Sequence, residues 1–147
     1  LANANFDLYV GDDNMLGAGN QFATWYIHQT PPDCNRVNNH ARMWDNIDDV
    51  SSLRGIRCQG MGCHRNEPEN VEVLEMHFSN KPLYHWTIYK DRGHPYQMYG
   101  LDGKTYGECI MFPGDTFGCP NAFGGMKSGV RMFRCLTQWT VEDIERA

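Results

Sequence analysis

The sequence has no hydrophobic run long enough to cross a lipid bilayer. Its densest apolar stretch, QFATWYI at 21–27, is far shorter than the roughly 20 residues of a spanning helix. Positive charge is also scarce, since 13 Lys and Arg stand against 18 Asp and Glu and the net charge is −5. Because nucleic acids and anionic membranes attract basic proteins, we expect neither as a partner.

The sequence also has no internal repeat, no low-complexity tract and no obvious linker. Its 147 residues, 41% hydrophobic and 21% charged, are typical of one folded domain spanning residues 1–147. The chain begins with leucine rather than methionine, which suggests that an upstream segment such as a signal peptide was removed.

Metal and redox motifs are absent from the pattern as well. Cys58, Cys63 and His64, in IRCQGMGCH, could supply zinc ligands, but no second matching pair accompanies them. The sequence has no Cys-x-x-Cys, and the neighbouring Cys63 and His64 would point apart. We therefore expect no bound metal and no cofactor.

Two glycine-rich segments fail as nucleotide-binding loops. In GAGNQF, Phe22 replaces the third glycine of the dinucleotide motif, and the segment precedes a strand rather than a helix. In FGGMKSG, Met126 separates Gly125 from Lys127, which excludes a phosphate-binding P-loop. Both segments are interpreted as turns.

Six cysteines are dispersed along the chain, an even number typical of disulfide-bonded extracellular proteins. They are Cys34, Cys58, Cys63, Cys109, Cys119 and Cys135. Six cysteines allow fifteen pairings, which sequence cannot decide. Cys34, just before the predicted helix, is expected to join the 58–63 segment just after it, while Cys109 and Cys135, at mid-strand positions, are expected to help connect sheet to loop.

A hairpin is the clearest structural prediction. If NVEVLEMHFSN (70–80) pairs with LYHWTIYKD (83–91), Leu74 faces Ile88, Met76 faces Trp86 and Phe78 faces Tyr84 on one apolar face. The same register pairs Glu72 with Lys90 and gathers four polar residues on the opposite face, namely Glu75, His77, His85 and Thr87.

Further strands are predicted at 6–10, 21–29, 96–100, 104–112 and 130–139, with an Asp102-Gly103 turn and a short helix starting at Thr140. Met43, Ile47 and Val50 are spaced as on one helix face, which predicts a helix over 38–53. The predicted fold class is therefore α+β: an antiparallel sheet of four or more strands, stapled by disulfides, with one main helix packed on one face.

Two functional patterns compete with plain structural roles. Glu75, His77 and His85 could act as acid and base, as in small secreted fungal ribonucleases, although no cation is evident on these two strands. The alternative is a solvated sheet face, and we expect no enzyme activity. Aromatic residues form 12% of the chain and could bind sugars or a protein, but core packing explains most of them.

The length, the dispersed cysteines and the sheet with helical cover resemble the LARS effectors, secreted proteins of leaf-infecting fungi. Family members carry a Trp-Arg-hydrophobic-Arg strand segment, and the nearest stretch here, Arg131-Met132-Phe133-Arg134, lacks the tryptophan. The resemblance implies a protein secreted into plant tissue, which binds host proteins and is recognised by immune receptors. It implies no more than an interaction-surface role for Arg131 and Arg134. Separately, we expect the protein to be a monomer.

Overall fold

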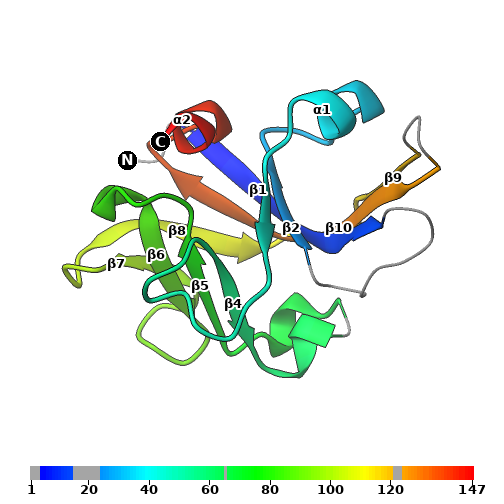
Figure 1. The fold of residues 1–147 in the computed structure, drawn as a ribbon. Helices are drawn as coiled ribbons and strands as arrows, with labels where there is room; N and C mark the ends of the chain where they lie inside the picture. Colours follow the sequence, from blue (N-terminus) through cyan, green and yellow to red (C-terminus); the bar gives the residue numbers. More distant parts are fainter. Residues whose placement is uncertain (1–3, 15–23, 65, 121–123) are drawn as a thin grey trace.

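The computed structural model of the chain describes residues 4–14, 24–64, 66–120 and 124–147 (Figure 1). Within them, ten strands form one antiparallel sheet in the order β3-β2-β1-β10-β8-β7-β6-β5-β4, with β9 paired to β10 beside β8. The strands are β1 (Ala4–Asn14), β2 (Thr24–His28), β3 (Met43–Asp45), β4 (Gly55–Gln59), β5 (Val73–His77), β6 (His85–Tyr89), β7 (Gln97–Gly100), β8 (Thr105–Met111), β9 (Thr116–Pro120) and β10 (Met126–Thr137). Helical segments are short: α1 (Cys34–Asn39), α2 (Val141–Arg146) and the 3-10 turns η1 (Met61–His64), η2 (Pro68–Asn70) and η3 (Pro82–Tyr84).

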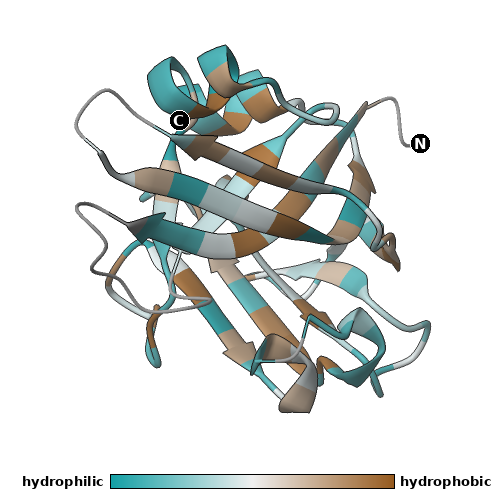
Figure 2. Cartoon of the chain, turned by 90° about the vertical axis from the view of Figure 1, so that its right-hand side faces the viewer, coloured by the Kyte–Doolittle hydropathy of each residue, from teal (hydrophilic) through white to brown (hydrophobic). Residues whose placement is uncertain are grey.

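The sheet curls into a nearly closed barrel. Its two ends meet through a parallel bridge between Asn46 and Ile56, where the Ile47 N–H donates to the Ile56 carbonyl at 3.1 Å. Apolar and polar residues alternate along the strands, as Figure 2 shows, so every second side chain enters the interior. Large buried side chains fill it, among them Phe6, Leu8, Trp25, Ile56, Leu74, Met76, Trp86, Ile88, Met98 and Met132.

The predicted α+β sheet covered by one main helix is wrong. Helix α1 ends at Asn39, and the rest of the predicted 38–53 helix is strand β3 followed by irregular chain. Trp44 is only 3% exposed, and its indole N–H donates to the Phe78 carbonyl at 3.1 Å. The apolar residues whose spacing predicted a helix face are therefore used instead to close the barrel.

The predicted hairpin is confirmed in its register. Strands β5 and β6 pair Leu74 with Ile88 and Met76 with Trp86. Beyond the strand ends, the Phe78 N–H donates to the Tyr84 carbonyl at 3.1 Å. The predicted Asp102-Gly103 turn connects β7 to β8, and Gly103 adopts a φ of 78°, which favours glycine.

A small outer layer covers the convex side of β1 and β2. It consists of α1 and β9, and its contact with the barrel is a second apolar cluster of Tyr9, Tyr26, Val37, Phe117 and Cys119. Gly129 makes room for it, because a Cβ there would lie 2.6 Å from the Phe117 ring. The outer layer places α1 next to α2, and this positions the cavity described below (Figure 1).

All six cysteines form disulfides, which confirms the disulfide-rich character of the chain. The bonds are Cys34–Cys119, Cys58–Cys63 and Cys109–Cys135. The expected link from Cys34 to the 58–63 segment is wrong, since Cys34 joins α1 to β9 in the outer layer. Cys109 and Cys135 are direct partners across β8 and β10, rather than links from sheet to loop.

Candidate functional site

The polar residues predicted on the hairpin do come together. The Glu75 carboxylate lies 2.7 Å from Nε2 of His85 and accepts a hydrogen bond from Nε of Arg57 at 3.0 Å. The ring of His77 stacks on that of His85 with centroids 4.5 Å apart, and its Nδ1 lies 2.7 Å from the Val50 carbonyl oxygen. Register explains this arrangement, because Arg57 faces Glu75 across β4 and β5, and His77 faces His85 across β5 and β6.

These groups are less exposed than a solvated sheet face would make them. His77 is 7% exposed and His85 5%, whereas the side chains of Glu75 and Arg57 are 19% and 23% exposed. Burial acts to raise the pKa of Glu75, but hydrogen bonds and charge from His85 and Arg57 outweigh it, so the pKa is lowered. Glu75 is therefore a carboxylate at neutral pH, held between a cation and an imidazole.

Arg57 is the member of this cluster that sequence reasoning missed. The hairpin alone offered no cation, because Arg57 comes from β4, on the far side of the η1 and η2 turns. The one sequence signal for Arg57 is the alternation within GIRCQ (55–59), which places Arg57 on the opposite face of the strand from the buried Ile56. The result is a carboxylate, an imidazole and a guanidinium in one row, a set able to exchange protons and bind an anion.

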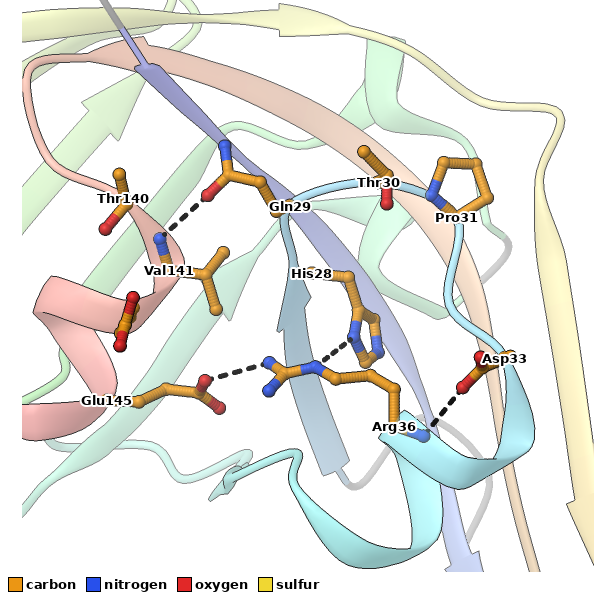
Figure 3. Close-up of a pocket in the computed structure, with 10 residues that line it drawn as sticks. His28, Gln29, Thr30, Pro31, Asp33, Arg36, Thr140, Val141 and Glu145 are labelled. Atoms are coloured by element: carbon orange, nitrogen blue, oxygen red, sulfur yellow. Dashed lines mark hydrogen bonds and ion pairs between the residues drawn. The ribbon is translucent and has the colours of Figure 1, made fainter.

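A cavity of about 690 Å³ lies elsewhere, between α1, α2 and the end of β2 (Figure 3). Arg36 crosses its floor and makes four hydrogen bonds: to Glu145 at 2.9 Å, to Nδ1 of His28 at 3.4 Å, and to the Ile27 and His40 carbonyls, each at 3.2 Å. Glu145 also accepts from the Arg42 N–H at 2.8 Å. The positive charge on the floor is therefore matched by a fixed carboxylate.

His28, at the back of this cavity, is 1% exposed and packs against the rings of Tyr9, Tyr26 and Phe117. Burial, and then the charge of Arg36, lower its pKa to about 3, so the imidazole is neutral at physiological pH. Because Nδ1 accepts from Arg36, the proton resides on Nε2, which has no hydrogen-bond partner among the described residues.

Arg131 and Arg134, predicted as a surface pair, are bound to Asp7 on β1. Arg134 donates to both carboxylate oxygens of Asp7, at 2.7 and 2.9 Å, and Arg131 lies 3.5 Å from one of them. Asp7 is fully buried and Arg131 is 8% exposed, while Arg131 also donates to the Phe112 carbonyl at 2.6 Å. These contacts tie β10 to β1, and an interaction role for the two arginines stays a prediction.

The other predicted features fall mainly in the core. Trp25, Trp44 and Trp86 are buried, whereas Trp139 is half-buried and stacks on Trp86 at 5.4 Å. Cys58 and Cys63 are bonded to each other, which removes the thiolates that a zinc site would need. Within the described ranges, no group of three or more His, Cys, Asp or Glu residues could hold a metal ion.

The first glycine-rich segment, GAGNQF (17–22), lies outside the described residues. In the second, FGGMKSG (123–129), only Phe123 lies outside them, and the predicted turn is wrong from Met126 onward, because these residues begin β10 and pair with β9. No helix in the described portion is of the length and apolar character that crossing a bilayer requires. Comparisons with protein-family models, with curated proteins and with solved structures find no match.

Proposed function

We propose that this chain is a secreted effector of a plant-pathogenic fungus that binds host proteins and is recognised by host immune receptors. The observation that carries the proposal is the set of three disulfides, which join α1 to β9, β4 to η1, and β8 to β10. Such bonds persist in oxidising surroundings, and they are typical of extracellular proteins. Large side chains fill the barrel interior, so we infer that the protein acts through its outer surface.

The pairing of polar groups also supports binding rather than catalysis. Glu75, the carboxylate of the candidate acid–base cluster, already has a partner on each side, and Asp7 is bound by two arginines. These contacts hold the partly exposed side chains of Glu75, Arg57 and Arg134 in place, which adds rigidity to the outer surface. A rigid surface loses little conformational freedom on binding, which favours affinity for a macromolecule.

The proposal is tested by two measurements on the producing organism. Native protein from culture medium should give no alkylated cysteine until it is reduced, and then six. Deletion of the gene should reduce symptoms on a susceptible host or abolish recognition by a resistant one. Native protein with free thiols, or a deletion strain unchanged on both hosts, would contradict the proposal.

A second candidate is a secreted nuclease, because Arg57 supplies the cation that the hairpin lacked. In this hypothesis the Glu75 carboxylate acts as base, an imidazole acts as acid, and Arg57 binds the phosphate. A phosphodiester would have to displace Glu75 from Arg57 or from His85, since both lie within 3.0 Å of it. The binding proposal needs no such rearrangement and is preferred.

An RNA-degradation assay decides between them. If the nuclease hypothesis holds, Glu75→Gln, His77→Ala and His85→Ala should each reduce cleavage by at least tenfold. His94→Ala is the matched control, since His94 is an exposed histidine on the loop between β6 and β7. Absence of cleavage by the wild-type protein, or cleavage unaffected by the three variants, would exclude the nuclease.

A further inference from the structure

We infer that the Cys34–Cys119 disulfide is a redox-sensitive switch in the outer layer, which a thiol reductant opens before either of the other two bonds and which then lets α1 separate from β9. The bond joins the first residue of α1 to β9, across a sequence separation of 85. The inference goes beyond the proposed function, because it holds whichever partner the protein binds.

The Cys34 end of this bond is accessible from solution. Cys34 is the one exposed cysteine of the six, all of which lie within the described residues, although Cys119 is buried. The Cys34 sulfur lies 3.8 Å from the carbonyl oxygen of Gly118, which is itself exposed, and a Cβ on Gly118 would meet nothing within 4 Å. Because thiol–disulfide exchange needs a thiolate to approach a sulfur atom, this access makes Cys34 the point of attack.

The other two disulfides are better shielded. Cys109 and Cys135 are 2% and 0% exposed and lie opposite each other on β8 and β10, within the main core cluster. Cys63 is 4% exposed, and the half-buried Cys58 packs against the same cluster. A reductant reaches Cys109–Cys135 only when the barrel opens, and Cys58–Cys63 offers it less access than Cys34 does.

The reaction is thiol–disulfide exchange with a low-molecular-weight thiol, here glutathione, as the reductant. Its thiolate attacks Sγ of Cys34, the sulfur–sulfur bond breaks, and Cys119 leaves as a thiolate that takes up a proton. A second glutathione thiolate attacks the mixed disulfide and releases Cys34, which is protonated in turn. Two electrons have then reduced the protein disulfide, and the two glutathione molecules are joined as their own disulfide.

Loss of the bond weakens the contact between α1 and β9. Besides the disulfide, Nδ2 of Asn38 donates to the Pro120 carbonyl at 3.1 Å, and Val37 of α1 shares the second apolar cluster with Phe117 of β9. A helix of six residues is too short to be stable without tertiary contacts. Once the covalent bond is broken, α1 therefore moves away from β9 far more readily.

The separation is local, since other contacts keep both elements on the barrel. Arg36 ties α1 to the Ile27 carbonyl and to Glu145, and β9 stays paired with β10 over five residue pairs. The movement uncovers part of the second apolar cluster, which includes the rings of Tyr26 and Phe117. The protein therefore presents one surface in an oxidising compartment and another in a reducing one.

The test treats purified, oxidised protein with glutathione at neutral pH and follows each cysteine by alkylation and peptide mass spectrometry. Cys34 and Cys119 should become alkylated at least tenfold faster than the other four cysteines, because access governs the attack. The species reduced at this bond alone should show at least tenfold faster hydrogen exchange in α1 and β9, while strands β4 to β8 stay unchanged.

Paired variants supply the controls. Cys34→Ser with Cys119→Ser should show the same fast exchange without reductant, and glutathione should not increase it further. Cys58→Ser with Cys63→Ser removes a bond outside the outer layer, and it should leave both the exchange of α1 and β9 and the reduction rate of Cys34–Cys119 within twofold of wild type. If a variant fails to fold, the wild-type measurements decide alone.

The inference is overturned if either of the other bonds is reduced first, if all three are reduced at one rate, or if loss of Cys34–Cys119 leaves the exchange of α1 and β9 unchanged. None of these outcomes involves a host or a binding partner, so they are separate from a failure of the proposed function.

Discussion

At the scale of single residues, His28 links the stability of the protein to pH. Its pKa is lowered from 6.5 to about 3 in the folded chain, chiefly because burial disfavours the imidazolium. Between these two values the unfolded chain binds the proton and the folded chain does not. The free energy of unfolding must therefore fall as pH is lowered through this window, and it is unaffected by His28 above it.

We expect His28 alone to remove about 3 kcal/mol of stability between pH 7 and pH 4, at roughly 1.4 kcal/mol per pH unit below 6.5. Urea unfolding at several pH values would measure this loss. His28→Phe keeps an aromatic ring among Tyr9, Tyr26 and Phe117 and should show a shallower pH dependence, whereas the exposed His94→Phe should retain the wild-type slope. Equal slopes for all three proteins would contradict the assignment.

Asp7 is the second residue whose environment makes a firm prediction. Asp7→Ala leaves the guanidinium of Arg131 buried and that of Arg134 half-buried, both without their carboxylate. Removing one partner of a buried ion pair costs about 3–5 kcal/mol, and we expect a loss of that order in urea unfolding. Glu142→Ala breaks the exposed pair with Arg146 and should leave the unfolding midpoint unchanged. Similar losses in both variants would show that Asp7 has no special role.

At the scale of elements, the three disulfides should differ in what they contribute. The Cys34–Cys119 bond spans a sequence separation of 85, Cys109–Cys135 one of 26 and Cys58–Cys63 one of 5. In the chain-entropy account, these separations correspond to about 4.5, 3.5 and 2 kcal/mol. Paired Cys→Ser variants should therefore lower the free energy of unfolding in that order. A larger loss on removing Cys58–Cys63 than Cys34–Cys119 would show that local packing outweighs chain entropy.

The sequence predicted those elements whose signals are local. The β5–β6 hairpin was recovered in register because alternation in two adjacent segments and the Glu72–Lys90 pairing all agree. The short helix at the end was also recovered, since Thr140 and Asp143 form a reciprocal capping box at its first turn.

The 38–53 segment shows where local reasoning failed. Its apolar spacing fits a helix, but Trp44 and Val50 are buried by residues distant in sequence, and β3 is needed to complete the barrel wall. The pairing of Cys34 with Cys119 was unpredictable for the same reason, because the outer layer brings α1 to β9 only after both fold onto the barrel. Arg57 joined Glu75 through such a non-local strand pairing as well.

At the scale of the whole molecule, β10 makes the barrel and the outer layer one cooperative unit. Its first half pairs with β9 and its second half with β8, while β1 runs along its other edge. We therefore expect a single unfolding transition, with tryptophan fluorescence and far-UV circular dichroism coinciding. In hydrogen exchange, amides of β1 and β10 should exchange among the slowest. Early exchange confined to α1 and β9 would indicate that the outer layer opens independently.

The packed barrel interior has a consequence for how such a protein can change over time. Because the side chains that hold the fold point inward, exposed residues such as Glu69 and Glu142 can be replaced with little effect on folding. If the protein is a secreted effector, selection by the host could change its exposed residues repeatedly while the buried residues stay the same. Divergent relatives of this chain would then share buried positions and disagree almost everywhere else.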